Sequence, residues 1–89
     1  MRLDKFLKVS RLIKRRVLAK EAAQRGLILI NNNQAKPGSR IDVGDILELN
    51  LGRRRFTVEV VALKDNVRTA EAASLYRVVK DEWVQTKTK

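Results

Sequence analysis

The sequence has no cysteine and no histidine among its 89 residues. Without thiols there can be no disulfide framework, and without thiols or imidazoles the usual ligands of a zinc site are missing. The same absences exclude a cysteine nucleophile, a Ser–His pair and a histidine acid–base pair. We therefore expect no catalytic residue, no metal and no cofactor, and we interpret the protein as a binding protein that is not an enzyme.

Aromatic residues and long apolar runs are also scarce. Aromatics make up 4% of the chain, which argues against a wide base-stacking platform. No apolar run approaches the ~20 residues of a membrane-spanning helix. Charges interrupt the first eleven residues, MRLDKFLKVSR, which is unlike a signal peptide. These features predict a cytoplasmic protein that does not enter a membrane.

What the sequence has in excess is positive charge, and the charge is unevenly distributed. The net charge is +10, from 20 basic and 10 acidic residues. Residues 1–40 hold eleven Lys or Arg against two acidic residues, a net +9, whereas residues 41–89 hold nine against eight, a net +1. A charge that served only solubility has no reason to segregate in this way. The segregation indicates a surface that binds a polyanion.

Two helices are predicted in the basic half. Apolar residues recur at steps of three and four over residues 3–13, and again over residues 17–25, where alanines favour close helix packing. Gly26 follows as a C-terminal cap. The three cations of residues 14–16 would form a tight corner between the helices.

Short strands are predicted next, at residues 27–30, 34–36, 46–51 and 56–61, separated by Asn- or Gly-containing turns. Thr69 would then cap a last helix with an apolar stripe of Ala72, Leu75, Tyr76 and Val79. The polar residues 85–89 should fray. We expect an RNA-binding unit over residues 1–63, with the core motif at about 2–49 plus a second hairpin, followed by a C-terminal helix and polar tail over residues 64–89.

The first half of the chain resembles the αL RNA-binding motif, the ribosomal-protein-S-four-like domain. The matching segments, in order, are residues 2–7 (RLDKFL), 10–16 (SRLIKRR), Ala19, Ala22, 26–28 (GLI), 30–31 (IN), 36–37 (KP) and 43–45 (VGD). The resemblance implies an α+β fold in which two N-terminal helices pack on a small, mostly antiparallel sheet, with a short C-terminal helix. Many residues in a fixed order make this match more specific than a short phosphate-binding loop.

Within that family, the chain is similar to the small stand-alone members of ribosome-associated quality control, which include the fifteen-kilodalton heat-shock proteins. The similarity extends to the Ala-Ala-Ser-Leu-Tyr segment at residues 72–76. It implies binding to large ribosomal subunits obstructed by peptidyl-tRNA, with contacts to ribosomal RNA and tRNA. It also implies cooperation with other quality-control factors that tail the stalled nascent chain. We expect a monomer away from the ribosome.

The candidate RNA-binding residues are cations on the helix pair and polar residues of the following loop. Cations crowded at a corner repel one another unless an anion joins them, and arginine can grip two phosphate oxygens. The predicted contacts are Arg2, Lys5, Arg11, Lys14, Arg15, Arg16, Lys20, Lys36 and Ser39. Asp4 is interpreted as a helix cap or as a carboxylate that orients arginine.

Several alternatives stand beside this interpretation. Arg53, Arg54 and Arg55 at a hairpin tip are either a second RNA contact or a device against edge-to-edge strand pairing. The whole protein is alternatively a structural ribosomal protein, or a general binder of structured RNA. A DNA-binding helix-turn-helix is less consistent, because the charge gathers at the corner instead of along a recognition helix. A pseudouridine synthase would need a separate catalytic domain, for which this length leaves no space.

Overall fold

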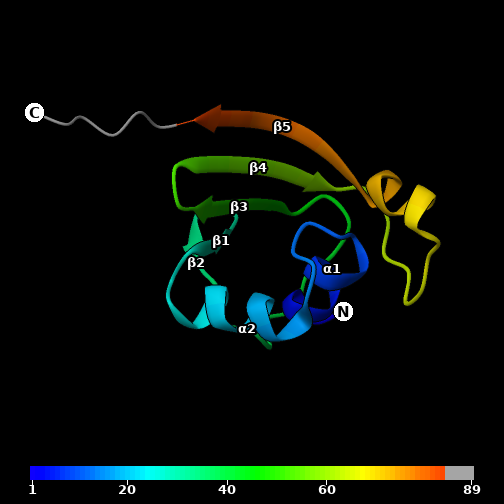
Figure 1. Cartoon of the computed structure of the whole chain (residues 1–89), viewed down its shortest axis with the longest axis horizontal. Helices are drawn as coiled ribbons and strands as arrows, with labels where there is room; N and C mark the ends of the chain where they lie inside the picture. Colours follow the sequence, from blue (N-terminus) through cyan, green and yellow to red (C-terminus); the bar gives the residue numbers. More distant parts are fainter. Residues whose placement is uncertain (84–89) are drawn as a thin grey trace, which may run out of the picture.

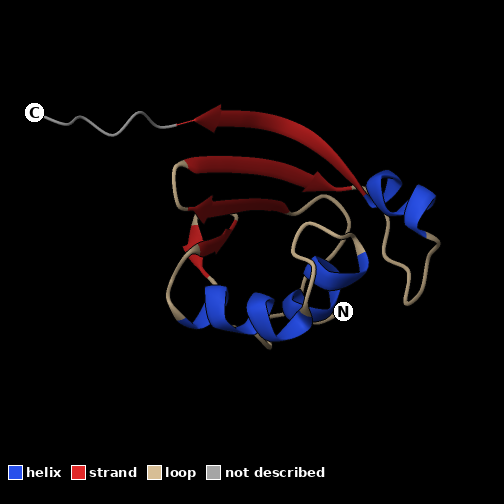
Figure 2. Cartoon of the chain, in the orientation of Figure 1, coloured by secondary structure: helices blue, strands red, loops and turns tan. Residues whose placement is uncertain are grey.

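The computed structural model describes residues 1–83, in which two helices lie against one face of an antiparallel sheet (Figures 1 and 2). The elements in chain order are α1 (Leu3–Val9), α2 (Arg16–Gln24), β1 (Ile28–Ile30), β2 (Asn33–Gln34), β3 (Ile46–Leu51), β4 (Arg54–Val60), a 3-10 helix η1 (Thr69–Leu75) and β5 (Tyr76–Trp83). The strand order is β2-β1-β3-β4-β5. The predicted α+β class is therefore confirmed. Within the described residues, no helix is long and apolar enough to span a membrane.

Helix α1 is shorter than the sequence predicted, because the chain reverses at Ser10 and Arg11. The Ser10 side chain is buried, donates to the carbonyl of Leu7 and accepts from the amide of Leu12. Arg11 has a φ of 62°, in the left-handed region that interrupts a right-handed helix. The predicted helical span of residues 3–13 was therefore wrong at its C-terminal end.

The loop at residues 36–39 holds the start of α1 in place. The amide of Leu3 donates to the carbonyl of Ser39 at 2.8 Å, and the amide of Asp4 donates to the carbonyl of Pro37 at 3.1 Å. These are two of the amide groups that a helix leaves without a partner at its N-terminus. The loop therefore fixes the position of Arg2, which directly precedes the helix.

The turns around β1 follow the sequence signals. Gly26 has a φ of 78° and ends α2, while Asn31 and Asn32 have φ values of 49° and 71° between β1 and β2. Asn is one of the few side chains that visits this left-handed region readily. The turn predictions at these three positions are confirmed. The return strand β2 is Asn33–Gln34, one residue earlier than the predicted start at Gln34.

One hydrophobic core joins the helix pair to the sheet. Leu3, Phe6 and Leu7 of α1 are completely buried, as are Leu47 and Val58 of the sheet. Alternation on β4 sends Phe56, Val58 and Val60 toward the helices and leaves Thr57 and Glu59 on the other face. Phe6 and Phe56 therefore both pack in the core. This packing gives the N-terminal cations a rigid base.

The predicted C-terminal helix is largely wrong. Thr69–Leu75 is a single 3-10 segment, and from Tyr76 the chain forms β5, which pairs antiparallel with β4. Ala72 and Leu75 are buried, but Val79 is 48% exposed. The spacing of these residues fits a helix, yet pairing of seven β5 residues with β4 satisfies the backbone and overrides that local pattern. The predicted fraying of residues 85–89 lies outside the described residues.

Candidate nucleic-acid interface

A buried carboxylate joins two of the predicted RNA-binding arginines. Arg2 donates two hydrogen bonds to Asp4, from Nε at 3.1 Å and from Nη2 at 3.2 Å, and Arg16 Nη2 donates to Asp4 Oδ1 at 3.4 Å. The Asp4 side chain is fully buried, whereas those of Arg2 and Arg16 are 53% and 44% exposed. Asp4 therefore orients two arginines whose remaining N–H groups face solvent, as the arginine-orienting interpretation predicted.

The electrostatics of this arginine–aspartate cluster (Arg2, Asp4 and Arg16) leave it positively charged. Burial by itself would raise the pKa of Asp4, but the hydrogen bonds and positive charges of Arg2 and Arg16 outweigh it, so the pKa lies below its ordinary value. Asp4 is thus ionised at neutral pH. Two guanidinium groups against one carboxylate give a net charge of +1, held in a fixed geometry suited to phosphate oxygens.

The loop at residues 36–39 lies beside this cluster. A Cβ added to Gly38 would come within 3.7 Å of the Arg2 guanidinium, so the loop backbone approaches that side chain closely. The Ser39 hydroxyl accepts a hydrogen bond from the amide of Lys36 at 2.8 Å and closes the turn. This gives Ser39 a structural role, and its contact with RNA stays a prediction.

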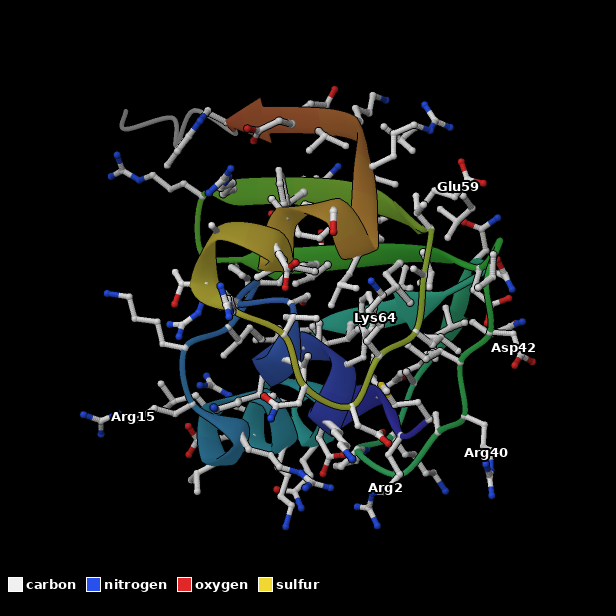
Figure 3. The ribbon with its side chains drawn as sticks, turned by 90° about the vertical axis from the view of Figure 1, so that its right-hand side faces the viewer. Arg2, Arg15, Arg40, Asp42, Glu59 and Lys64 are labelled. Carbon is white, nitrogen blue, oxygen red and sulfur yellow. The ribbon has the colours of Figure 1, made fainter. Side chains whose placement is uncertain are left out.

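Arg40 belongs to the same surface, although the sequence analysis did not select it. Arg2 and Arg40 form an isolated antiparallel bridge, which places the two exposed arginines side by side. In Figure 3 the side chains of Arg2 and Arg40 project outward from the same end of the molecule, and Arg15 projects from the opposite side of that end. The sequence signal that could have identified Arg40 was its position directly after the loop of residues 36–39.

The other predicted cations are distributed over three places. Arg11, Lys14 and Arg15 are exposed on the connection between the helices, and Lys20 is exposed on α2. Lys5 instead forms an ion pair with Asp65 at 3.0 Å. Its ammonium group therefore contacts the loop between β4 and η1. Lys5 is therefore not gathered with Arg2 around Asp4.

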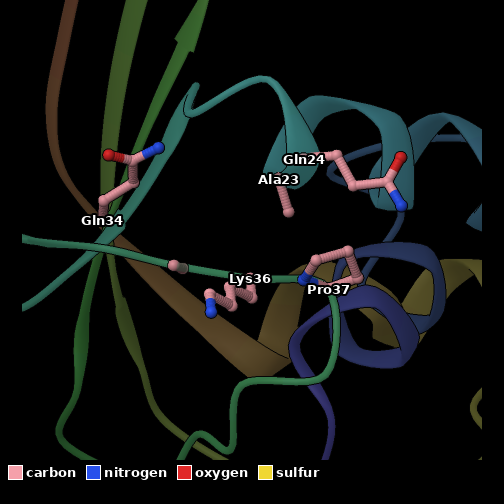
Figure 4. Close-up of a pocket in the computed structure, with 6 residues that line it drawn as sticks. Ala23, Gln24, Gln34, Lys36 and Pro37 are labelled. Atoms are coloured by element: carbon pink, nitrogen blue, oxygen red, sulfur yellow. The ribbon is translucent and has the colours of Figure 1, made fainter.

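A pocket of about 460 Å³ opens between α2 and the segment that follows β2 (Figure 4). Ala23 and Gln24 line one side, and Gln34, Lys36 and Pro37 line the other. The lining offers amides, one amine and apolar surface, but no carboxylate. Within residues 1–83 there is also no group of three acidic residues that would hold a metal ion.

The hairpin tip differs from the prediction. Only Gly52 and Arg53 form the turn, and Arg54 and Arg55 already belong to β4. Arg54 donates two hydrogen bonds of 2.9 Å to Asp81 on β5, which is part of the unpredicted strand. The placement of all three arginines on a tip was therefore wrong, because β4 begins at Arg54 and pairs with a strand that was predicted to be a helix. Arg53 and Arg55 remain exposed.

Comparisons with known proteins agree with this architecture. The model of the S4 domain family matches residues 1–47. A protein of Bacillus subtilis named RQC P-site tRNA stabilizing factor is 56% identical over 82 residues, which cover 92% of this chain and 95% of that protein. Heat shock protein 15 of Escherichia coli is 38% identical over 77 residues, or 85% of this chain and 58% of that protein.

A solved structure shows the same fold. The trimeric structure of heat shock protein 15 from Vibrio cholerae has a TM-score of 0.83 and 32% identity, and the match covers 89% of this chain and 81% of that one. The family-model match covers more than half of the chain, and the structural match extends beyond it to most of the sheet. This chain is a member of the S4 domain family.

Proposed function

We propose that this chain is a non-catalytic RNA-binding protein that holds P-site tRNA on large ribosomal subunits obstructed by peptidyl-tRNA. The observation that carries the proposal is the cluster of Arg2 and Arg16 on buried Asp4, at the centre of the basic half of an S4 domain. The name of the Bacillus subtilis relative, at 56% identity over nearly the full length of both chains, supports P-site tRNA as the ligand.

The cluster suits a holding role because it is rigid before it binds. Asp4 is buried in α1, the first amides of α1 are bonded to the loop at residues 36–39, and Arg16 begins α2. The arginines therefore lose little conformational freedom when they meet phosphates, and less of the binding free energy is lost to ordering. Exposed Arg15, Lys20 and Arg40 would extend the contact along the nucleic-acid backbone.

The proposal also covers the RNA partners, the place of action and the oligomeric state. The protein would contact ribosomal RNA of the large subunit and the tRNA together, and so keep the tRNA in place while other quality-control factors tail the nascent chain. It would act in the cytoplasm, and as a monomer away from the ribosome. A domain of 10.2 kDa with extents of 45 × 24 × 22 Å is small enough to bind on the surface of the large ribosomal subunit that is exposed when the small subunit leaves.

The test is co-sedimentation of the full chain with purified large subunits, with and without peptidyl-tRNA in the P site. We expect stronger co-migration with the obstructed subunits, and loss of that preference in Arg16→Ala. Arg77→Ala is the matched control, because Arg77 is an exposed arginine paired with Glu59 on the face of the sheet away from the helices. Equal co-migration with both kinds of subunit would leave a general RNA-binding protein and refute the quality-control role.

A further inference from the structure

Trp83 is an unusually exposed aromatic residue at the end of the sheet. It is the only tryptophan of the chain, it ends β5, and 70% of its surface is accessible. Strand register places it directly opposite Arg54, next to the β3–β4 turn at the left end of the sheet in Figure 1. The other aromatics on this sheet, Phe56 and Tyr76, pack edge to face and are at least partly buried. Trp83 therefore has a different role from the core aromatics.

The side of Trp83 that faces the protein is held by Arg54. The Arg54 guanidinium lies 4.2 Å from the centroid of the Phe56 ring and 5.6 Å from that of Trp83. Two hydrogen bonds to Asp81 fix the guanidinium between the rings, and they raise the pKa of Arg54 and lower that of Asp81. Cation–π contact with a fixed guanidinium restricts the indole. Arg54 thus acts as a spacer that positions Trp83.

The charge around Trp83 is suited to a polyanion. Asp81 compensates Arg54, while exposed Arg53 and Arg55 form no ion pair with any residue of 1–83. Lys80 pairs with Glu82 at 3.6 Å. Alternation along β4 places Arg55 on the opposite face of the sheet from Arg54 and Trp83, so the uncompensated cation on hand at the ring is Arg53, in the turn directly before Arg54. An apolar peptide would gain from the ring alone, whereas a nucleotide gains from the ring through its base and from Arg53 through its phosphate.

We propose that Trp83 is a stacking site for a single unpaired RNA base, with Arg53 contacting a flanking phosphate. The site is separate from the Arg2–Asp4–Arg16 cluster, which lies on the helical side of the molecule nearer the N-terminus (Figure 1). That the ligand is RNA rests on the proposed function. One domain would then bind helical RNA backbone at the cluster and an unstacked nucleotide at Trp83, and the joined contacts would bind more tightly than either alone.

Intrinsic fluorescence of the full chain tests the site directly, because Trp83 is the only tryptophan. The probes are an oligoadenylate of eight nucleotides and an abasic ribose–phosphate oligomer of the same length and charge. We expect saturable quenching by the oligoadenylate and little by the abasic chain. Trp83→Ala should weaken oligoadenylate binding, measured by anisotropy of a labelled strand, by roughly 5- to 100-fold, and Trp83→Phe should retain most of it. Val79→Ala, at an exposed apolar position of the same strand, is the control.

The outcomes separate this site from the proposed function. Quenching that survives Arg16→Ala supports an independent stacking site, even if selective binding to obstructed subunits is lost. Equal quenching by the abasic chain, or no quenching at saturating oligoadenylate, overturns the stacking site and leaves the co-sedimentation result unaffected. A Trp83→Ala variant that loses subunit binding without any base-dependent quenching also overturns it, and would indicate a protein contact instead.

Discussion

Two arginine–aspartate arrangements occur among residues 1–83, and they differ in what remains exposed. At the N-terminal end, fully buried Asp4 holds two arginines, so the group keeps a net positive charge and presents N–H donors to solvent. At the end of the sheet, Asp81 has a side chain 38% exposed and holds only Arg54, so the pair is neutral. The first arrangement leaves oriented cations exposed to solvent, whereas in the second the cation lies against an aromatic ring.

The largest expected difference between the two concerns stability. Asp4→Asn removes the negative charge that Arg2 and Arg16 both contact. It leaves a buried amide beside two cations without a counter-charge, so it should lower the free energy of unfolding by about 2–4 kcal/mol. Asp81→Asn should lower the melting temperature much less, because exposed ion pairs contribute little. Chemical unfolding of both variants measures the contrast. A larger loss in Asp81→Asn would reverse the comparison.

The helical half of this comparison was accessible from the sequence, because its signals are local. Apolar spacing located both helices, and Gly26, Asn31 and Asn32 marked turns by their conformational preferences. An arginine-orienting role for Asp4 was one of two interpretations of its position at a helix start, the other being a helix cap. Only the structure shows that Arg16 is the second partner. Twelve residues separate that pair, and helix packing brings them together.

The sheet half was not accessible, because its determinants are distant in sequence. Tyr76 and Val79 fit a helical stripe with Ala72 and Leu75, and only pairing with β4 makes them part of a strand. Once β5 was missed, the partner of Arg54 was missed too, since Asp81 lies 27 residues away. The β-branched pair Val78 and Val79, followed by Trp83, was the signal for a strand, and the alanines before it favoured the helix.

The second expected difference concerns affinity for structured RNA. Arg16→Ala should weaken binding to tRNA by about 10- to 100-fold, because it removes a charge-assisted contact worth ~1.5–3 kcal/mol. Arg54→Ala should weaken it less, since Asp81 already accepts from its guanidinium. Fluorescence anisotropy at one salt concentration measures both, with circular dichroism as the check on folding. Comparable losses in the two variants would show that Arg54 matters to RNA binding as much as Arg16 does, either by direct contact or by positioning Trp83.

A third difference concerns pH. The pKa of Asp4 is lowered in the folded protein, so its ionised form stabilises the fold above the unfolded carboxyl pKa of about 3.9, and this contribution is lost as the pH falls through the folded pKa. The free energy of unfolding should therefore fall more steeply below about pH 4 in the wild-type protein than in Asp4→Asn. Urea unfolding at pH 7 and at pH 3 checks this. Parallel pH profiles for the two proteins would mean that Asp4 does not contribute.

The smallest expected difference is in the salt dependence of RNA binding. Neutralisation of ~5–8 phosphates makes log affinity fall linearly with log salt concentration, and each lost phosphate contact reduces the slope by about one. Arg16→Ala should reduce the slope by that amount, because the remaining Arg2 only balances Asp4 and the cluster loses its net charge.

Arg54→Ala leaves Asp81 without a partner and adds a local negative charge, but removes no phosphate contact. Its affinity can therefore shift while the slope stays near the wild-type value. Titrations from 50 to 200 mM salt, about the range over which such slopes are measured, distinguish the two. An unchanged slope in Arg16→Ala would mean that the arginine–aspartate cluster orients the helices without touching the nucleic acid.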